Sequence, residues 1–278
     1  MQAVELETKS EVDLAREFLY RFLSLALTSP HSPDWPFPLS PDDQRLALES
    51  AVVLQDEADF PSDFLSFGEL SPDNLDLVAL LNELNSSLDQ IKADHNRIFG
   101  LVIPKECPPY ETEYVSTSEA FQRTQQLADI AGFYCAFGLE PSNQSPERHD
   151  NVVLELEFMA FLLLKKRLAV SDPEDVDEAA EHVLVCEEAE HSFMKDHLSW
   201  WLPAFATGLM SKSGSGVYHE IGRTLAALIP AERYRLNVAA PFKPARPELI
   251  EYPEEDGGCE TGSSSGETGC SSCGASGQ

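Results

Sequence analysis

Tyrosines and carboxylates alternate in one short stretch of the chain, which reads CPPYETEY over residues 107–114. Aromatic rings beside carboxylates can hold an arginine-bearing peptide, because both groups attract a guanidinium. The two prolines forbid helix and fix an extended turn. If a helix begins after them, the two tyrosines and two glutamates of the stretch are spaced to share one face: Tyr110, Glu111, Glu113 and Tyr114. The stretch therefore predicts a peptide-binding face or, alternatively, a proline-initiated helix whose tyrosines complete the core.

A second polar stretch, Glu147–Asn151, directly precedes a strongly apolar segment. Its side chains allow two interpretations. Asp150 or Asn151 can cap the following helix, because a short side-chain oxygen accepts the unpaired amide hydrogens of the first turn. In the functional interpretation, Glu147 and Asp150 are acidic contacts at the mouth of a groove.

Catalytic and metal chemistry find less support. Glu188 and His191 make one Glu-x-x-His step, whereas di-iron bundles need two such steps and two further glutamates. Near the C-terminus, Cys259, Cys270 and Cys273 are weak candidates for a soft metal or a redox disulfide. There is no glycine-rich phosphate loop. We predict a protein that is not an enzyme and carries no cofactor; the alternative is a metal-binding helical protein or enzyme that uses these residues.

Helical spacing dominates the elements that must position these residues. Apolar residues recur at steps of three and four, as at Leu14, Phe18, Phe22 and Leu25. Strand-like alternation with hairpin turns is missing. The pattern predicts an all-α helical bundle of about seven or more helices. Its clearest segments are 73–91, begun by Ser71 and Pro72, then 121–137, ended by Gly138, and 151–170, 175–201 and 216–228.

One helical domain is expected over residues 1–246, with a possible hinge in the polar connector Gln144–His149. The segment Pro247–Gln278 is acidic and rich in Gly, Ser and Cys. Such a composition buries too little apolar surface to offset the entropy of ordering, which predicts a disordered tail.

Charge excludes several classes of protein. The chain carries 48 acidic and 19 basic residues, a net charge of −29. Nucleic acid and anionic membrane surfaces attract the opposite sign, so neither is an expected partner. No apolar run approaches the ~18 residues of a membrane span, and Met1–Ser10 lacks the basic start of a secretory signal. These features predict a cytoplasmic protein with reduced body cysteines.

The segments NRIFG, CPPYETEY and residues 121–169 together resemble the TorD-type family of molybdoenzyme assembly chaperones, which includes DmsD- and NarJ-like proteins. A weaker match covers 193–205, with a His-Leu pair followed by Trp and Pro. The resemblance implies an all-helical cytoplasmic chaperone for a DMSO-reductase-type enzyme. Such proteins bind the apo catalytic subunit, and often its twin-arginine signal peptide, until the molybdopterin cofactor is inserted.

The resemblance implies that Glu147, Arg148 and Asp150 contact the client, in addition to Tyr110, Glu111 and Tyr114. The sequence departs from the family at two positions. Where the family commonly has Pro-Asp-His, this chain has His149 and Asn151 on either side of Asp150. A contact made by the family histidine is therefore not expected here. The identity of the client, and whether the chain is a monomer or a domain-swapped dimer, stay open.

Overall fold

The structure is a computed structural model that describes residues 2–32, 35, 40–55, 60–100, 106–116, 120–140, 147–171 and 176–241. Over these ranges the regular elements are helices and short helical turns, without any strand, so the predicted all-α class is confirmed. No helix in these ranges is long and apolar enough to cross a membrane. The predicted tail and residues 144–146, half of the predicted hinge, lie outside the described residues.

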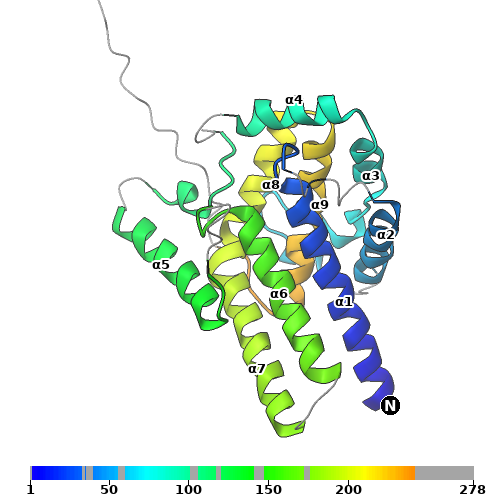
Figure 1. Ribbon diagram of the computed structural model, residues 1–278, viewed down its shortest axis with the longest axis vertical. Helices are drawn as coiled ribbons and strands as arrows, with labels where there is room; N and C mark the ends of the chain where they lie inside the picture. The colour runs from blue at the N-terminus through cyan, green and yellow to red at the C-terminus, as the bar shows by residue number, and fades with distance from the viewer. Residues whose placement is uncertain are drawn as a thin grey trace, which may run out of the picture.

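Three helices form one side of the molecule: α1 (Gln2–Leu27), α6 (Val152–Ser171) and α7 (Val176–Phe193). They run side by side in Figure 1, and α2 (Pro41–Gln55) packs against α1. The predicted helical stripe in α1 is displaced, because Leu14 is 47 % exposed. Helix α1 contacts α6, α2 and α9, so most of its second half is buried. Because neighbours cover it on several sides, one apolar stripe does not identify the face that packs. The fully buried side chains of α1 include Leu19, Tyr20, Phe22, Leu23 and Ala26.

A long helical path continues from α7 through a π turn, Met194–Leu198, into α8 (Ser199–Ser213). It packs against α9 (Val217–Arg235), which extends beyond the predicted end at residue 228. Pro230 lies inside α9 and has no amide hydrogen for the carbonyl of Ala226. That carbonyl accepts a hydrogen bond from the backbone of Leu70 instead, at 2.8 Å. The proline thus creates an attachment point for a loop.

The prediction of one helix over residues 73–91 is wrong. The structure has a 3-10 turn, Pro72–Asn74, followed by α3 (Val78–Leu84) and α4 (Leu88–Phe99). Short polar side chains form hydrogen bonds with the backbone at the points where the segment is divided. The Asp76 carboxylate accepts from the amide of Val78 at 2.9 Å, and the Asn85 side chain donates to the carbonyl of Leu81 at 2.8 Å. Helical spacing survives as a set of buried leucines: Leu75, Leu77, Leu80, Leu81 and Leu84.

At the edge of the bundle lies α5 (Ala120–Ala136), seen on the left of Figure 1. Its predicted end is confirmed, since Gly138 has a φ of 73° and closes the helix. Most of its surface is exposed, and it is held through Ile130 and Tyr134, which are buried.

A buried cluster of charges joins four helices. Arg16 of α1 contacts Glu190 of α7 at 3.0 Å and Glu232 of α9 at 2.8 Å. Lys166 of α6 contacts the same Glu190 at 2.9 Å and Asp13 at 3.1 Å. Charges taken out of water need partners of opposite sign, so each of these residues requires the others. The cluster therefore makes the relative placement of α1, α6, α7 and α9 specific.

Candidate functional site

The two polar stretches singled out in the sequence lie against each other. Tyr110 and Asn151 form an antiparallel bridge. The amide of Glu111 donates to the carbonyl of Asp150 at 2.9 Å, and the amide of Val152 donates to the carbonyl of Pro109 at 2.9 Å. The prolines make this contact possible, because they keep the chain extended until Glu111 begins a 3-10 turn, Glu111–Tyr114.

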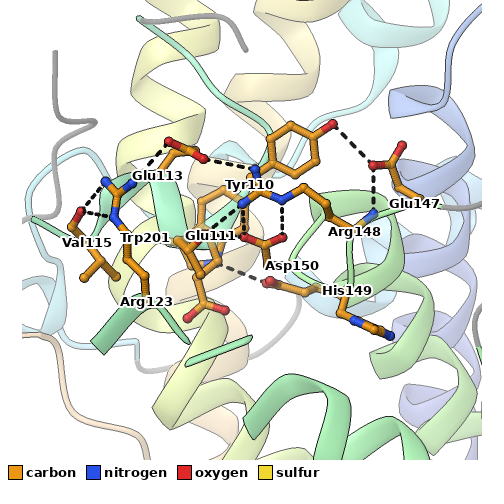
Figure 2. A network of polar contacts seen from close by, with 12 residues as sticks. Tyr110, Glu111, Glu113, Val115, Arg123, Glu147, Arg148, His149, Asp150 and Trp201 are labelled. Atoms are coloured by element: carbon orange, nitrogen blue, oxygen red, sulfur yellow. Dashed lines mark hydrogen bonds and ion pairs between the residues drawn. The ribbon is translucent and has the colours of Figure 1, made fainter. Parts of the chain in front are cut away.

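Arg148 holds the two stretches together. Its Nε and Nη2 atoms donate to the two carboxylate oxygens of Asp150, at 3.0 and 2.8 Å. Its Nη1 donates to Glu113 at 3.0 Å, and its guanidinium carbon lies 4.2 Å from the ring centroid of Tyr110. Figure 2 shows this fork and the aromatic ring beside it. A planar guanidinium can make both kinds of contact at once, which a lysine ammonium cannot.

Asp150 is an internal support with no exposed surface. Besides Arg148, it accepts hydrogen bonds from the amide and the hydroxyl of Thr112, at 3.1 and 2.7 Å. It therefore does not cap the following helix. Asn151 does so, because its side-chain oxygen accepts from the amide of Val153 at 2.9 Å. The position at which the family commonly has histidine is thus occupied here by a helix cap.

Tyr110 and Glu147 border an open pocket of about 360 Å³. The tyrosine hydroxyl donates to the Glu147 carboxylate at 3.3 Å, and Glu147 is exposed. Burial, more than the neighbouring Glu147, raises the pKa of Tyr110, so the phenol keeps its proton and stays a donor. The pocket wall is mixed, with apolar and neutral polar side chains beside this acidic rim. Its lining includes Leu27, Ser29, Ser32, His95, Phe99, Pro109, Val153 and Leu154.

His95 forms part of the pocket wall as a neutral ring. Burial lowers its pKa, and nearby His31 lowers it further. Its ring packs against Phe99 and Tyr218, with centroids 5.2 and 5.9 Å apart. The pocket wall therefore adds no positive charge at neutral pH, and Glu147 supplies its negative charge.

Glu111 points to a different part of the molecule and is fully buried. Its carboxylate accepts from Gln126 Nε2 at 2.6 Å and from Trp200 Nε1 at 2.8 Å. The Nδ1 atom of His197, in the π turn, lies 3.1 Å from Glu111 Oε2. The other ring nitrogen lies 3.4 Å from the carboxylate of Asp129. Glu111 thus ties the 3-10 turn to α5, the π turn and α8.

Behind Glu111 lies a second buried carboxyl group, Glu155 of α6. Burial, followed by the adjacent Glu111, raises the pKa of Glu155 well above its ordinary value. Glu155 Oε2 accepts from Trp201 Nε1 at 3.1 Å, while Oε1 has no donor among the described residues. A protonated Glu155 that donates to the Glu111 carboxylate satisfies both groups, since two adjacent buried carboxylates would repel each other.

Tyr114 completes the core, as the alternative interpretation of the stretch proposed. Its side chain is 6 % exposed, its hydroxyl donates to the carbonyl of Pro108 at 3.2 Å, and its ring lies 5.2 Å from that of Trp201. The predicted residues therefore do not share one face. Tyr110, Glu147, Arg148 and Asp150 lie together, whereas Glu111 and Tyr114 face the interior.

Several residues of this region escaped the sequence analysis. Thr112 lies within the CPPYETEY stretch but was not singled out, and Glu113 was expected only on a shared helical face; nothing in their spacing shows that they contact Arg148. A second set of residues is distant in sequence and shares no pattern. Of these, His197, Trp200 and Trp201 lie in the segment 193–205 that was part of the resemblance. This second set comprises Gln126, Asp129, Glu155, His197, Trp200 and Trp201.

The residues of the metal-binding alternative are not gathered. His191 Nδ1 lies 2.8 Å from the carbonyl of Leu236, and Glu188 is exposed. The described residues contain no group of three or more His, Cys, Asp or Glu side chains that could hold a metal ion. Cys107 and Cys186 are buried free thiols, and Cys135 is an exposed free thiol. The tail candidates Cys259, Cys270 and Cys273 lie outside the described residues.

This all-helical fold, with the Pro-Pro-Tyr turn held against the start of α6, has counterparts among known proteins. The family model for the nitrate reductase delta subunit matches residues 69–207, half of the chain. The chain belongs to this family, which confirms the TorD-type resemblance noted in the sequence. The matched region contains the Cys107–Val115 segment, Arg148 and Asp150, and most of the path from α7 into α8.

Individual relatives are assembly chaperones by name. The chain is 33 % identical over 115 residues to the selenate reductase assembly chaperone protein of Thauera selenatis, covering 41 % of this chain and 55 % of that protein. It is 31 % identical over 110 residues to the chlorate reductase assembly chaperone protein of Ideonella dechloratans, covering 40 % and 52 %. The chaperone protein TorD of Vibrio cholerae is 24 % identical over 164 residues, covering 58 % and 70 %. The chain thus spans about half the length of the first two relatives.

Proposed function

We propose that this protein is a cytoplasmic assembly chaperone for a DMSO-reductase-type molybdenum enzyme. It binds the apo catalytic subunit and the twin-arginine signal peptide of that subunit. By holding both, it assists cofactor insertion and prevents premature export. It catalyses no reaction and holds no cofactor of its own. The family membership and the names of the relatives support the chaperone role.

The pocket beside Tyr110 and Glu147 carries the proposal that a signal peptide binds. A twin-arginine signal places a basic pair before an apolar segment. The pocket offers the complementary chemistry, with a carboxylate at its rim and Leu27, Phe99 and Val153 in its wall. Glu147 is the charged contact for an arginine, and the ring of Tyr110 supplies an aromatic edge.

The remaining residues of the site act as supports. Arg148 and Asp150 keep Tyr110 and Glu147 in place, because Arg148 contacts Tyr110 and Glu113 and Asp150 accepts hydrogen bonds from Thr112, which joins the two stretches. Glu111 and Tyr114 anchor the 3-10 turn from the interior side. We therefore assign direct client contact to Tyr110 and Glu147, and positioning to Arg148, Asp150, Glu111 and Tyr114.

Capture of the client subunit tests this function. The purified chain is mixed with the catalytic subunit of a candidate reductase in three forms: apo with its signal peptide, apo without it, and cofactor-loaded. We expect the strongest binding to the first form and at least about tenfold weaker binding to the loaded subunit, which corresponds to roughly 1.4 kcal/mol. Equal affinity for the apo and loaded subunits would contradict a role in cofactor insertion.

A further inference from the structure

The far end of the α6–α7 hairpin lies at the lower edge of Figure 1, where α7 projects slightly beyond the N-terminal end of α1. From Val176 to Val185, no side chain of α7 is fully buried, and only Ala179 and Val183 are partly covered. Helices of a folded domain normally bury one face, so this length of α7 lacks a partner on most of its circumference.

Apolar side chains gather on this projecting end. Val176, Ala180 and Leu184 follow each other at steps of four, which places them along one side of the helix. Val176 is 73 % exposed and Leu184 is 58 % exposed. Single exposed apolar residues are ordinary, but several on one helical hairpin mark a contact surface. The same end also exposes Val185 of α7 and Leu168 and Val170 of α6.

A small apolar pocket of about 90 Å³ opens next to this surface, between α1, α6 and α7. Val170 and Val183 line it, and Glu187 lies at its edge. On the side toward the body, Lys166 and Asp13 belong to the buried charge cluster that joins α1, α6 and α7. The cluster holds the base of the hairpin in place, so the projecting surface is presented in a fixed orientation.

The charges around this surface are mainly acidic. Glu181 and Glu188 are exposed on α7, within two turns of Leu184. Asp177 and Glu178 are exposed acids at the start of the same helix. Among the nearby cations, Lys166 is paired inside the body at 2.9 Å from Glu190 and Arg167 is paired with Glu17 at 2.7 Å, which leaves the exposed Lys165 to offset the acidic side chains only in part. A surface with apolar positions and acidic borders fits a partner segment with the opposite pattern.

We propose that the projecting end of the α6–α7 hairpin, Leu168–Ser171 and Val176–Glu188, is a second docking surface for a basic amphipathic helix of a partner protein. A second copy of this chain would bring the same acidic border and a net charge of −29 against it, which is unfavourable. An anionic membrane would be repelled for the same reason. The identification of the partner as the client subunit rests on the proposed function. The apolar and acidic character of the surface is independent of that function.

The test uses a synthetic 18-residue peptide of Leu and Lys with leucines at helical spacing, and a scrambled peptide of the same composition. The full chain is compared with Val176→Lys/Leu184→Lys, two substitutions at exposed positions that should leave the melting temperature unchanged. Val52→Lys is the control for an added lysine at an exposed apolar position, because Val52 is 57 % exposed on helix α2; combined with Leu46→Lys, at a second exposed apolar position of α2, it matches the two added charges of the double variant. We expect the double variant to bind the amphipathic peptide at least about tenfold more weakly, and the control to bind within about twofold of the parent.

Several outcomes would overturn the inference. One is equal binding of the amphipathic and scrambled peptides, which would indicate only attraction to overall charge. Equal losses in the double variant and in Val52→Lys would have the same meaning. Self-association of the parent that the double variant abolishes, or binding of the parent to anionic lipid vesicles, would assign the surface to another occupant. Failure of the proposed function is distinguishable, because binding of a twin-arginine peptide to the Tyr110–Glu147 pocket should be unaffected by Val176→Lys/Leu184→Lys.

Discussion

The guanidinium of Arg148 lies over the ring of Tyr110, 4.2 Å from its centroid. The same guanidinium donates two hydrogen bonds to the buried carboxylate of Asp150. One side chain therefore holds both Asp150 and Tyr110, which borders the pocket. This relationship explains why residues 38 to 40 positions apart in sequence act as a unit, and it yields the first prediction.

Replacing Arg148 with lysine should lower both stability and peptide affinity. Lysine cannot form the planar fork, so Asp150 keeps a buried charge with poorer compensation. We expect a loss of roughly 1.5–3 kcal/mol in the free energy of unfolding, because the Asp150 carboxylate loses charge-assisted hydrogen bonds worth about that much. Urea unfolding provides the measurement. Arg45→Lys is the control, since Arg45 and Glu49 form a solvent-exposed pair that contributes little to stability; equal effects of the two substitutions would refute the role of Arg148.

The pH dependence of stability should change in Glu155→Gln. In the unfolded chain Glu155 ionises near its ordinary pKa of 4.5, whereas burial and Glu111 raise the pKa in the folded protein. Its contribution is therefore fully present below pH 4.5 and is lost as pH rises from there through the folded pKa. Glutamine cannot ionise and can still donate to Glu111.

Unfolding measured from about pH 5 to 8 should show a smaller decline in stability for Glu155→Gln than for the parent. Glu49→Gln, at an exposed position on α2, should follow the parent. A decline in Glu155→Gln as steep as in the parent would mean that Glu155 is ionised in the folded protein.

The acid side of the profile depends on Glu232. Burial alone would raise the pKa of Glu232, but the Arg16 guanidinium outweighs this and holds it below the ordinary 4.5. Its contribution is present above pH 4.5 and is lost as pH falls through the folded pKa. Glu232→Gln should cost roughly 3–5 kcal/mol at neutral pH and flatten the acid limb. Glu220→Gln, on the same helix, should cost no more than about 1 kcal/mol; an unchanged acid limb in Glu232→Gln would contradict the assignment.

Asn151 borders the pocket but is only 7 % exposed, and we expect its side chain to act as a helix cap and not as a contact for the client. Asn151→Ala should lower the free energy of unfolding by about 1 kcal/mol, because the amide of Val153 loses its acceptor. Asn151→Ser should recover most of that stability. Peptide affinity measured by calorimetry should be the same in all three proteins. Lower affinity in both variants, with stability restored in Asn151→Ser, would place Asn151 in the binding surface.

The sequence predicted the fold class and most helices because apolar spacing reports burial directly. It failed over residues 73–91, where the leucine spacing is helical but Asp76 and Asn85 divide the helix. Hydrophobic periodicity does not report such side-chain bonds to the backbone. It also misplaced the buried face of α1, because several neighbours cover that helix.

The site was predictable only in part. Tyr110, Glu147 and Asp150 were identified from their residue types and Arg148 through the resemblance, and the structure brings the four together. The interior partners of Glu111 were not identified, because Gln126, His197 and Trp200 lie on separate elements. Whether a glutamate contacts a ligand at the surface or anchors the interior depends on the residues that surround it in the fold. The local spacing of the sequence does not report those residues. Asp150 illustrates this, since its acidic character indicated a ligand contact and its burial indicates a support.

Calorimetry with a twin-arginine peptide tests the central claim most directly. The peptide comprises the signal sequence of the client, with a control in which both arginines are glutamine. The parent chain should bind the first peptide and lose affinity as salt increases. Glu147→Lys should weaken binding by at least about tenfold, roughly 1.4 kcal/mol, without a lower melting temperature, because Glu147 is exposed. Asp63→Lys, the same charge change at an exposed position on another element, should leave affinity nearly unchanged. Equal affinity of the parent, Glu147→Lys and Asp63→Lys for the peptide would contradict the assignment of this pocket as the signal-peptide site.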